Sequence, residues 1–296
     1  MSRWTARVVT FLALFQLAAG LTVRPLSPFG AEITDVTNLD EAFGQIEKVL
    51  LEHKVVAVRN QADLTVEGLR AFTRHFGELH VHLESASHLD GYTDVNVVSN
   101  IRNAEGNFIG LYGKHVENYH SDLSWAHLPT KYTILKSVVR PTECGETHFV
   151  DSTAAYSQLN STLKSKVDNL RANYCYLKTR DLQDESGLTA EQVLEAQNCA
   201  NHPIINTHPV TKRRNIYANP SHTSSIIGMD RQESDAVLAA LYGHTQQERF
   251  VYAHHWQDHD LVLWDNRAMQ HRATGCAEEY PRMLIRTTVL NDEPPV

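Results

Sequence analysis

Three patterns are missing from this chain of 296 residues, and each absence excludes a class of protein. No run of Lys and Arg longer than three residues occurs and the net charge is -8, so the composition does not favour a nucleic-acid partner. The four cysteines form no C-x-x-C motif, which argues against a structural zinc site. Outside the N-terminal residues there is no apolar run long enough for a stable membrane span.

Cysteine is scarce, and its state is left open by the sequence. Four cysteines in a chain of this length are too few for a disulfide scaffold. Cys144, Cys175, Cys199 and Cys276 could form one or two bridges, with three complete pairings to choose from. Buried free thiols are an equal alternative.

The N-terminus has the layout of a secretory signal peptide. Two arginines lie within the first seven residues, residues 8–19 are almost wholly apolar, and small residues surround position 19. We predict a targeting segment over residues 1–20 that leads to the secretory pathway or an organelle. A mitochondrial presequence or an amphipathic first helix is the alternative, and an uncleaved leader would leave the chain cytoplasmic. The sequon at Asn160 becomes meaningful only in the secretory case.

Residues 21–296 are predicted to form a single domain. Short strands with peripheral helices are typical of a β-sandwich or jelly roll. We expect helices at 39–53, 65–76, 152–170 (a pair) and 230–243, and strands at 55–59, 95–99, 129–139, 249–255, 261–264 and 284–289. The polar segment 179–206 has irregular periodicity, and we expect it to be a lid-like insertion.

A metal site is indicated by His120 and Asp122, which are two positions apart. On an extended strand these positions point to the same face. With His271 as the third ligand they form the facial triad of two histidines and one carboxylate found in non-haem Fe(II) oxygenases. Without a third ligand they would be a surface hydrogen-bonded pair. A second histidine cluster at 254, 255 and 259 is expected to lie on the surface.

These motifs resemble the taurine dioxygenase and 2,4-dichlorophenoxyacetate dioxygenase group of Fe(II)/2-oxoglutarate enzymes. The resemblance runs from about residue 23 to residue 292, and Tyr119 stands where the family often has Trp. It implies a mainly β fold with peripheral helices around a double-stranded β-helix, or jelly-roll, core. The ordered set that carries it is Tyr119-His120-Ser121-Asp122-Leu123-Ser124, Gly145-Glu146-Thr147-His148-Phe149-Val150-Asp151, Trp264-Asp265-Asn266-Arg267, Gln270-His271-Arg272-Ala273, Arg282 and Arg286.

The resemblance also implies the cofactors and their ligands. Fe(II) would be bound by the catalytic residues His120, Asp122 and His271, with 2-oxoglutarate and O2 as co-substrates and ascorbate as an additive in vitro. Thr147 and Arg282 match the positions that bind the distal carboxylate of 2-oxoglutarate. The planar guanidinium of Arg suits a carboxylate.

Two further positions match residues that contact the primary substrate. Arg286 would pair with a carboxylate or sulfonate, and on a regular strand it shares a face with Arg282 because their separation is even. His82 matches a substrate-contacting histidine. The alternatives are an ordinary salt-bridged Arg286 and a structural His82. Trp264 and the Asp265-Asn266 pair are interpreted as scaffold, with the pair shaping the turn before His271.

The resulting hypothesis is a dioxygenase that oxidises an unactivated C–H bond of a small anionic substrate while 2-oxoglutarate is decarboxylated to succinate and CO2. Asp122 argues against a halogenase, in which Ala or Gly replaces the carboxylate. One alternative is an oxidative cyclase or desaturase of secondary metabolism, such as one performing kainoid-type ring closure. Another is a non-catalytic sensor that binds metal and 2-oxoglutarate. A homo-oligomer is left open.

Overall fold

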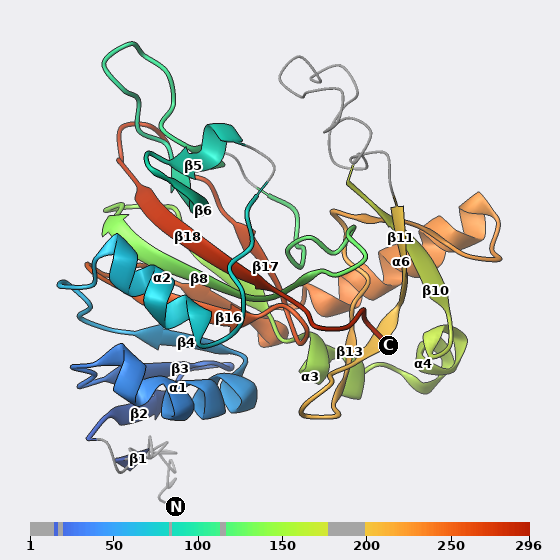
Figure 1. The fold of residues 1–296 in the computed structure, drawn as a ribbon. Coiled ribbons are helices and arrows are strands. Elements are labelled where there is room, and N and C mark those ends of the chain that lie inside the picture. Colours follow the sequence, from blue (N-terminus) through green and yellow to red (C-terminus); the bar gives the residue numbers. More distant parts are fainter. Residues whose placement is uncertain (1–14, 17–19, 83–84, 113–116, 177–198) are drawn as a thin grey trace, which may run out of the picture.

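The computed structural model describes residues 15–16, 20–82, 85–112, 117–176 and 199–296, and its largest element is a twisted, mainly antiparallel sheet (Figure 1). This large sheet is continued at one edge by β7 (Leu111–Tyr112), which pairs with β6. Its strand order is β1 (Phe15–Gln16), β2 (Thr22–Pro25), β3 (Ala31–Thr34), β4 (Val55–Val58), β16 (Leu261–Asp265), β8 (Thr130–Val139), β18 (Met283–Leu290), β6 (Tyr92–Ser99) and β5 (His88–Leu89).

A small sheet packs on the inner face of the large one. Its order is β15 (Val251–His254), β9 (Thr147–Val150) and β17 (Gln270–Ala273). β8 of the large sheet is followed by β9 of the small one, and β15, β16, β17 and β18 then alternate between the small and the large sheet, so the chain crosses between the sheets four times. This arrangement is the predicted jelly roll. The core between the sheets includes Leu135, Trp264 and Leu284 from the large sheet and Phe149 from the small one.

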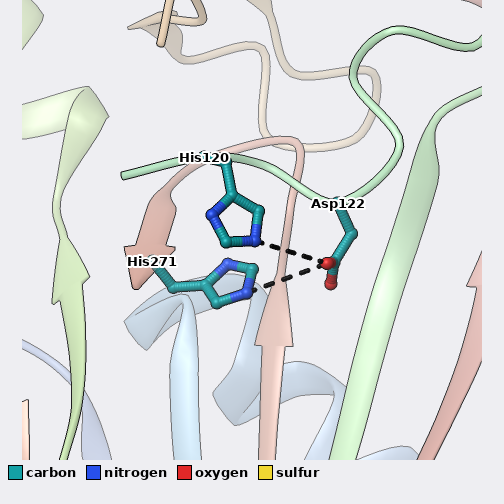
Figure 2. A group of neighbouring side chains, drawn as sticks. All are labelled: His120, Asp122 and His271. Carbon is teal, nitrogen blue, oxygen red and sulfur yellow. Dashed lines mark ion pairs between the residues drawn. The ribbon is translucent and has the colours of Figure 1, made fainter. Parts of the chain in front are cut away.

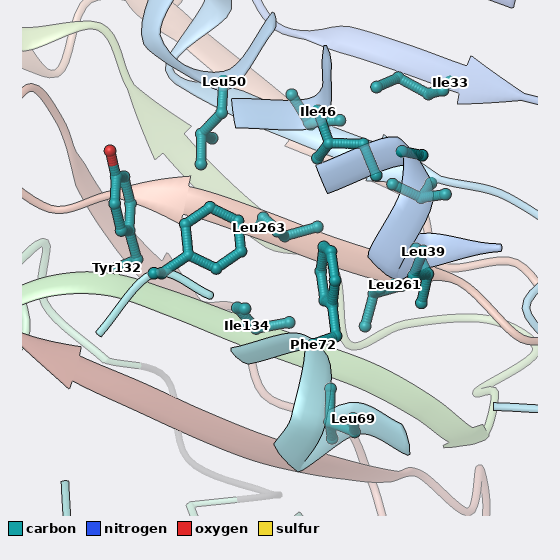
Figure 3. Close-up of a cluster of buried hydrophobic side chains, with 14 of the residues drawn as sticks. Ile33, Leu39, Ile46, Leu50, Leu69, Phe72, Tyr132, Ile134, Leu261 and Leu263 are labelled. Carbon is teal, nitrogen blue, oxygen red and sulfur yellow. The ribbon is translucent and has the colours of Figure 1, made fainter. Parts of the chain in front are cut away.

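Helices α1 (Leu39–His53) and α2 (Val66–Arg74) cover the outer face of the large sheet, as Figure 3 shows. Their starts were predictable because Asn38 and Thr65 cap them with side-chain oxygens that accept backbone N–H groups. The buried stripe of each helix packs on apolar strand residues. The side chains labelled in the figure are Ile33, Leu39, Ile46, Leu50, Leu69, Phe72, Tyr132, Ile134, Leu261 and Leu263.

A second lobe lies beside the jelly roll, with a hydrophobic core of its own (Figure 1). Two short 3-10 turns are also among the helical segments that the structure describes: Ser85–Ser87 precedes β5 of the large sheet, and Glu248–Phe250 precedes β15 of the small one. The helices of the lobe are α3 (Ser152–Ser157), α4 (Ser161–Val167) and α6 (Arg231–Thr245). Its strands are β10 (Arg171–Cys175), β11 (Cys199–Pro203), β12 (Ile205–Thr207), β13 (Arg214–Ile216) and β14 (Thr223–Ile226).

The predicted lid-like insertion is corrected in part. Residues 177–198 lie outside the described residues, but residues 199–206 form β11 and the start of β12. The polar residues of this stretch misled the prediction because their partners are distant in sequence. His202 Nε2 lies 2.8 Å from the carbonyl oxygen of Ala126, and the side-chain amide of Asn206 donates to the carbonyl of Arg267. These bonds allow polar side chains to be buried in the lobe.

All four cysteines form disulfides. Cys144 pairs with Cys276, and Cys175 pairs with Cys199. This selects one of the three possible pairings, and the free-thiol alternative is wrong. Among the residues that the structure describes, no helix combines the length and apolar character needed to span a bilayer. Most of the predicted targeting segment, residues 1–14 and 17–19, lies outside the described residues.

Candidate metal centre

Three side chains distant in sequence converge at one end of the jelly roll. His120 and His271 exchange two backbone hydrogen bonds, of 2.9 and 2.8 Å, which bring their ring centroids to 4.3 Å. The Nε2 atoms of both rings lie 3.8 Å from Oδ1 of Asp122 (Figure 2). All three ligand atoms lie within 4.8 Å of one another. A single ion between them could therefore contact all three.

The route by which Asp122 reaches this point differs from the prediction. His120 makes only an isolated bridge to His271, and the chain then turns, with backbone bonds from Ser124 to Ser121 and from Ala126 to Leu123. The expected extended strand is therefore wrong, although the convergence it was meant to explain is present. The cause is tertiary, since the hydroxyl of Ser121 donates to the carbonyl of Met269, on the segment that leads into β17.

The orientation of the Asp122 carboxylate is set by two residues. The hydroxyl of Thr133 donates to Oδ2, and the side-chain amide of Asn266 donates to that hydroxyl at 2.9 Å. Asn266 Oδ1 also accepts the backbone N–H of Asp122 at 3.1 Å. These bonds leave Oδ1 facing the two histidines. Asn266 was predicted only to shape a turn, and Thr133 was missed; its one sequence signal is a polar residue in a buried strand.

The electrostatics suit metal ligands. Burial alone would raise the pKa of Asp122, but the proximity of His271, Arg286 and His120 holds that pKa well below its usual range. Burial, followed by the proximity of His120, lowers the pKa of His271 to about 3, so its imidazole is neutral. Nδ1 of His120 lies 2.9 Å from the carbonyl oxygen of Asn118, which can only accept a hydrogen bond, so the tautomer with the proton on Nδ1 satisfies this contact. Nε2 of His120 therefore keeps its lone pair for a metal.

The donor set fits Fe(II). Two imidazoles and one carboxylate on one side of an ion are the ligands of the facial triad, which leaves coordination positions open on the other side. Within the described part of the chain, this is the one group of three or more His, Cys, Asp or Glu side chains close enough to share an ion.

Arg282 is a buried cation that forms no ion pair with any carboxylate among the described residues. Its exposed fraction is 2%, and its Nε has no hydrogen-bond partner among the described residues. Burial lowers its pKa to about 10 although Glu117 opposes this. An unpaired buried charge is costly, so a bound carboxylate would stabilise this site. The position suits the distal carboxylate of 2-oxoglutarate, the role predicted for Arg282.

Thr147 lies on the same face of the small sheet as His271. In the β9–β17 register, Thr147 is opposite Ala273 and Phe149 is opposite His271, and residues two apart on a strand share a face. The indole of Trp256 donates to the Thr147 hydroxyl at 3.3 Å. That hydroxyl can still donate its own proton to an anion, so the predicted role of Thr147 stays a prediction that the geometry allows.

Arg286 lies beside the metal ligands. Its Nη1 is 3.6 Å from Oδ1 of Asp122, and its buried Nε has no partner in the part of the chain described. Leu284 belongs to the core between the sheets and Ile285 to the core on the outer face, so Arg286 is directed to the inner face. Arg282 precedes β18, and the pairing of β18 with β8 is irregular between Met283 and Leu284, so the shared face of the two arginines stays a prediction.

His82 lies near Arg286. Its Nε2 is 2.9 Å from the hydroxyl of Thr288, which follows Arg286 by two positions on the inner face of β18. Burial, with a smaller contribution from Arg286, lowers the pKa of His82 to about 2. His82 is therefore neutral, and its other ring nitrogen could contact a substrate. Both this role and the structural alternative stay open.

The histidine cluster at 254, 255 and 259 is corrected for one member. His254 has an exposed fraction of 0%, with Nε2 at 3.1 Å from Oδ2 of Asp260, a carboxylate that also pairs with Arg59. The surface prediction was wrong here because β15 turns His254 inward, where a buried acid supplies its partner. His255 and His259 are exposed, as predicted.

Comparisons with known proteins agree with this geometry. The profile of the family described as "Taurine catabolism dioxygenase TauD, TfdA family" matches residues 22–288. An alpha-ketoglutarate-dependent 2,4-dichlorophenoxyacetate dioxygenase of Cupriavidus pinatubonensis is 31% identical over 292 residues, covering 92% of this chain and 98% of the relative. An alpha-ketoglutarate-dependent sulfate ester dioxygenase of Pseudomonas putida is 28% identical over 294 residues, covering 96% and 94%.

Solved structures show the same likeness. A taurine dioxygenase from Burkholderia xenovorans superposes with a TM-score of 0.75 at 29% identity, covering 93% of this chain and 92% of its own. AAD-2 in complex with Mn(II) and N-oxalylglycine gives a TM-score of 0.76 at 28% identity, covering 93% and 99%. The fold is therefore shared with relatives that span nearly the whole chain.

Proposed function

The chain belongs to the taurine catabolism dioxygenase TauD, TfdA family, and from this premise we propose that its primary substrate is a small organic anion anchored by Arg286. The enzyme is an oxidoreductase that uses Fe(II), 2-oxoglutarate and O2. Bound Fe(II) supplies the activation of O2 that couples decarboxylation of 2-oxoglutarate, to succinate and CO2, with oxidation of a substrate C–H bond.

The residues of this chain contribute binding, orientation and exclusion of water. His120, Asp122 and His271 would hold the iron, and Thr133 keeps one carboxylate oxygen turned toward it. Arg282 would take the distal carboxylate of 2-oxoglutarate through charge-assisted hydrogen bonds. The apolar core between the sheets lies behind His271, whose ring packs 4.6 Å from that of Trp264 and shields the site from solvent on that side.

The observation that carries the substrate proposal is a second, partly buried arginine beside the metal ligands. Among the described residues, Nε of Arg286 has no hydrogen-bond partner, and its guanidinium forms an ion pair only with Asp122, which a metal would engage. The guanidinium is therefore available to an anionic group held close to the iron. Relatives are named for sulfonate, sulfate ester and phenoxyacetate substrates, all of which are anions. We propose a carboxylate, sulfonate or sulfate ester for this enzyme.

The alternative functions receive no support. The relatives named above are alpha-ketoglutarate-dependent dioxygenases, which favours a catalytic oxygenase over a sensor. No side chain described above favours ring closure or desaturation, or a place in secondary metabolism.

Separate titrations test the two arginine assignments. Succinate release and O2 uptake would be measured with Fe(II), 2-oxoglutarate and a panel of carboxylates, sulfonates and sulfate esters. We expect Arg282→Ala to raise the KM for 2-oxoglutarate and Arg286→Ala to raise the KM for the anionic substrate, each by about 10- to 100-fold for the loss of a charged hydrogen bond worth about 1.5–3 kcal/mol. Arg70→Ala removes a salt bridge with Asp94 away from the site and serves as the control. Exchanged effects would show that the two roles are reversed, and turnover with neutral isosteres equal to that with anions would exclude the anionic substrate.

We also propose that the enzyme works in an oxidising compartment of the secretory pathway. The support is that all four cysteines are paired, because disulfides persist mainly in such compartments. Asn160 is exposed and caps α4 through Oδ1, which accepts the backbone N–H of Leu163 at 2.9 Å, so its amide nitrogen is available for a glycan. Mass spectrometry of the protein isolated from its own cells tests this. A protein that retains the predicted targeting segment over residues 1–20, and whose mass does not change after enzymatic removal of N-glycans, would contradict the proposal.

A further inference from the structure

Two segments that cross between the sheets run side by side at one end of the jelly roll. Residues 140–146 link β8 to β9, and residues 274–282 link β17 to β18. Because β8 pairs with β18 and β9 pairs with β17, both segments cross at the same place. The backbone N–H and hydroxyl of Thr274 each donate to the carbonyl of Glu146 at 3.1 Å. We call these segments the crossover pair, and the Cys144–Cys276 disulfide joins them.

The crossover pair encloses the side chain of Arg282. Gly145, next to Cys144, has a φ of +82°, and a Cβ placed on it would lie 2.8 Å from Cδ and 3.2 Å from Nε of Arg282. The first crossover segment therefore rests directly on the arginine. A residue with a side chain at this position would both adopt an unfavourable backbone conformation and displace Arg282.

The second crossover segment is held to the backbone of Arg282 by Asn100. The side-chain amide of Asn100 donates to the carbonyls of Cys276, Ala277 and Tyr280, at 3.3, 3.0 and 3.0 Å. Its Oδ1 accepts the backbone N–H of Arg282 at 2.7 Å. A shift of Cys276 relative to Cys144 would therefore change how the guanidinium is placed between the two segments.

The disulfide is reachable from solvent. Cys276 is buried, but Cys144 is partly exposed, and both line a surface hollow with Thr274, Gly275, Ala277 and Glu278. A small thiol could approach the sulfur of Cys144 through this hollow, and access of this kind governs the rate of thiol–disulfide exchange.

We infer that the Cys144–Cys276 disulfide positions Arg282 for 2-oxoglutarate and that its reduction weakens 2-oxoglutarate binding. The inference rests on the proposed assignment of Arg282 to that co-substrate. In the reduction, a dithiol attacks one sulfur, the S–S bond breaks, and a second exchange releases the dithiol as a cyclic disulfide. Its two electrons and two protons leave Cys144 and Cys276 as thiols. The enzyme would then bind its co-substrate fully only where disulfides persist.

Paired double variants test the inference. The affinity of the Fe(II)-loaded protein for 2-oxoglutarate would be measured by anaerobic calorimetry, and the affinity for Fe(II) would be measured separately. We expect C144S/C276S to raise the Kd for 2-oxoglutarate at least tenfold while the Kd for Fe(II) stays within twofold of the wild type. C175S/C199S removes the other disulfide, which joins β10 to β11 in the second lobe, and should change neither constant by more than twofold. Equal 2-oxoglutarate affinity in the two double variants would overturn the inference.

Two further measurements keep the test decisive if C144S/C276S fails to fold. The folded wild-type protein would be reduced in place with a phosphine, which leaves no chelating thiol, and desalted anaerobically; mass spectrometry would establish that Cys144 and Cys276 are reduced. A Kd for 2-oxoglutarate unchanged by that reduction also overturns the inference. Arg282→Ala distinguishes the role of Arg282 in binding 2-oxoglutarate from the role of the disulfide in positioning Arg282. If Arg282→Ala weakens 2-oxoglutarate binding and loss of the disulfide does not, only the role of the disulfide fails. If Arg282→Ala has no effect, the assignment of Arg282 fails and the inference fails with it.

Discussion

Replacing Thr133 by Val should weaken metal binding although Thr133 is not a metal ligand. The two side chains have nearly the same shape, so the change removes a hydroxyl and adds a methyl group at a site that is 0% exposed. That hydroxyl donates to Oδ2 of Asp122 and accepts from the amide of Asn266. The variant therefore frees the carboxylate to rotate and leaves a buried N–H group without its acceptor.

The magnitude of each effect can be worked from these two bonds. Loss of a partner that orients a metal ligand typically costs 10- to 100-fold in metal affinity, or about 1.4–2.7 kcal/mol. The unpaired amide of Asn266 should lower the free energy of unfolding of the metal-free protein by about 1–3 kcal/mol. The two losses are separable because one is measured with metal and the other without it.

Anaerobic titration with Fe(II) and urea unfolding of the metal-free protein measure the two effects. Thr73→Val is the matched control, since the buried Thr73 hydroxyl bonds to Thr287 and to the carbonyl of Leu69 in the core on the outer face. It should lower stability by a similar amount and leave Fe(II) affinity unchanged. If Thr133→Val binds Fe(II) as tightly as Thr73→Val does, the argument that Thr133 orients the carboxylate is refuted.

Two other predictions concern the ligands and the pH dependence of stability. His120→Ala and His271→Ala should each abolish iron binding and turnover together, measured as metal content after dialysis and as succinate release; stoichiometric iron in either variant would remove that residue from the ligand set. Burial lowers the pKa of His202 to about 4 from an ordinary value of 6.5, so between these values the unfolded chain binds a proton that the folded chain does not. The neutral state of His202 therefore contributes up to about 3 kcal/mol to the free energy of unfolding. This contribution is fully present above pH 6.5 and is lost as the pH falls toward 4. Urea midpoints of the wild type and His202→Gln between pH 7 and 4 should diverge accordingly, and parallel curves would contradict the assignment.

Chemistry that restricts residue types could be predicted from the sequence. An iron site needs imidazole and carboxylate ligands. Few sets of two histidines, one carboxylate and a following arginine in this chain match the family spacing, and His120, Asp122 and His271 with Arg282 form such a set. Helices α1 and α2 were equally predictable, since the apolar periodicity lies within each helix and the capping residue directly precedes it.

Features that depend on contacts between distant residues could not be predicted. Nothing near Asp122 indicates that Thr133 and Asn266 orient it, and nothing near Asp260, the buried partner of His254, indicates that Arg59 pairs with it in the interior. The polar stretch 199–206 was taken for a lid because its hydrogen-bond partners are far away in sequence.

The candidate metal ligands could thus be selected from the sequence by residue type and spacing, whereas their orientation was decided by the tertiary structure. The same division applies to the cysteines. Their number and spacing allow three pairings, and only the packing of two crossover segments brings Cys144 to Cys276 beside Arg282. The physical reason is that a side chain's reactivity is its own, while its position and partners depend on how remote segments pack.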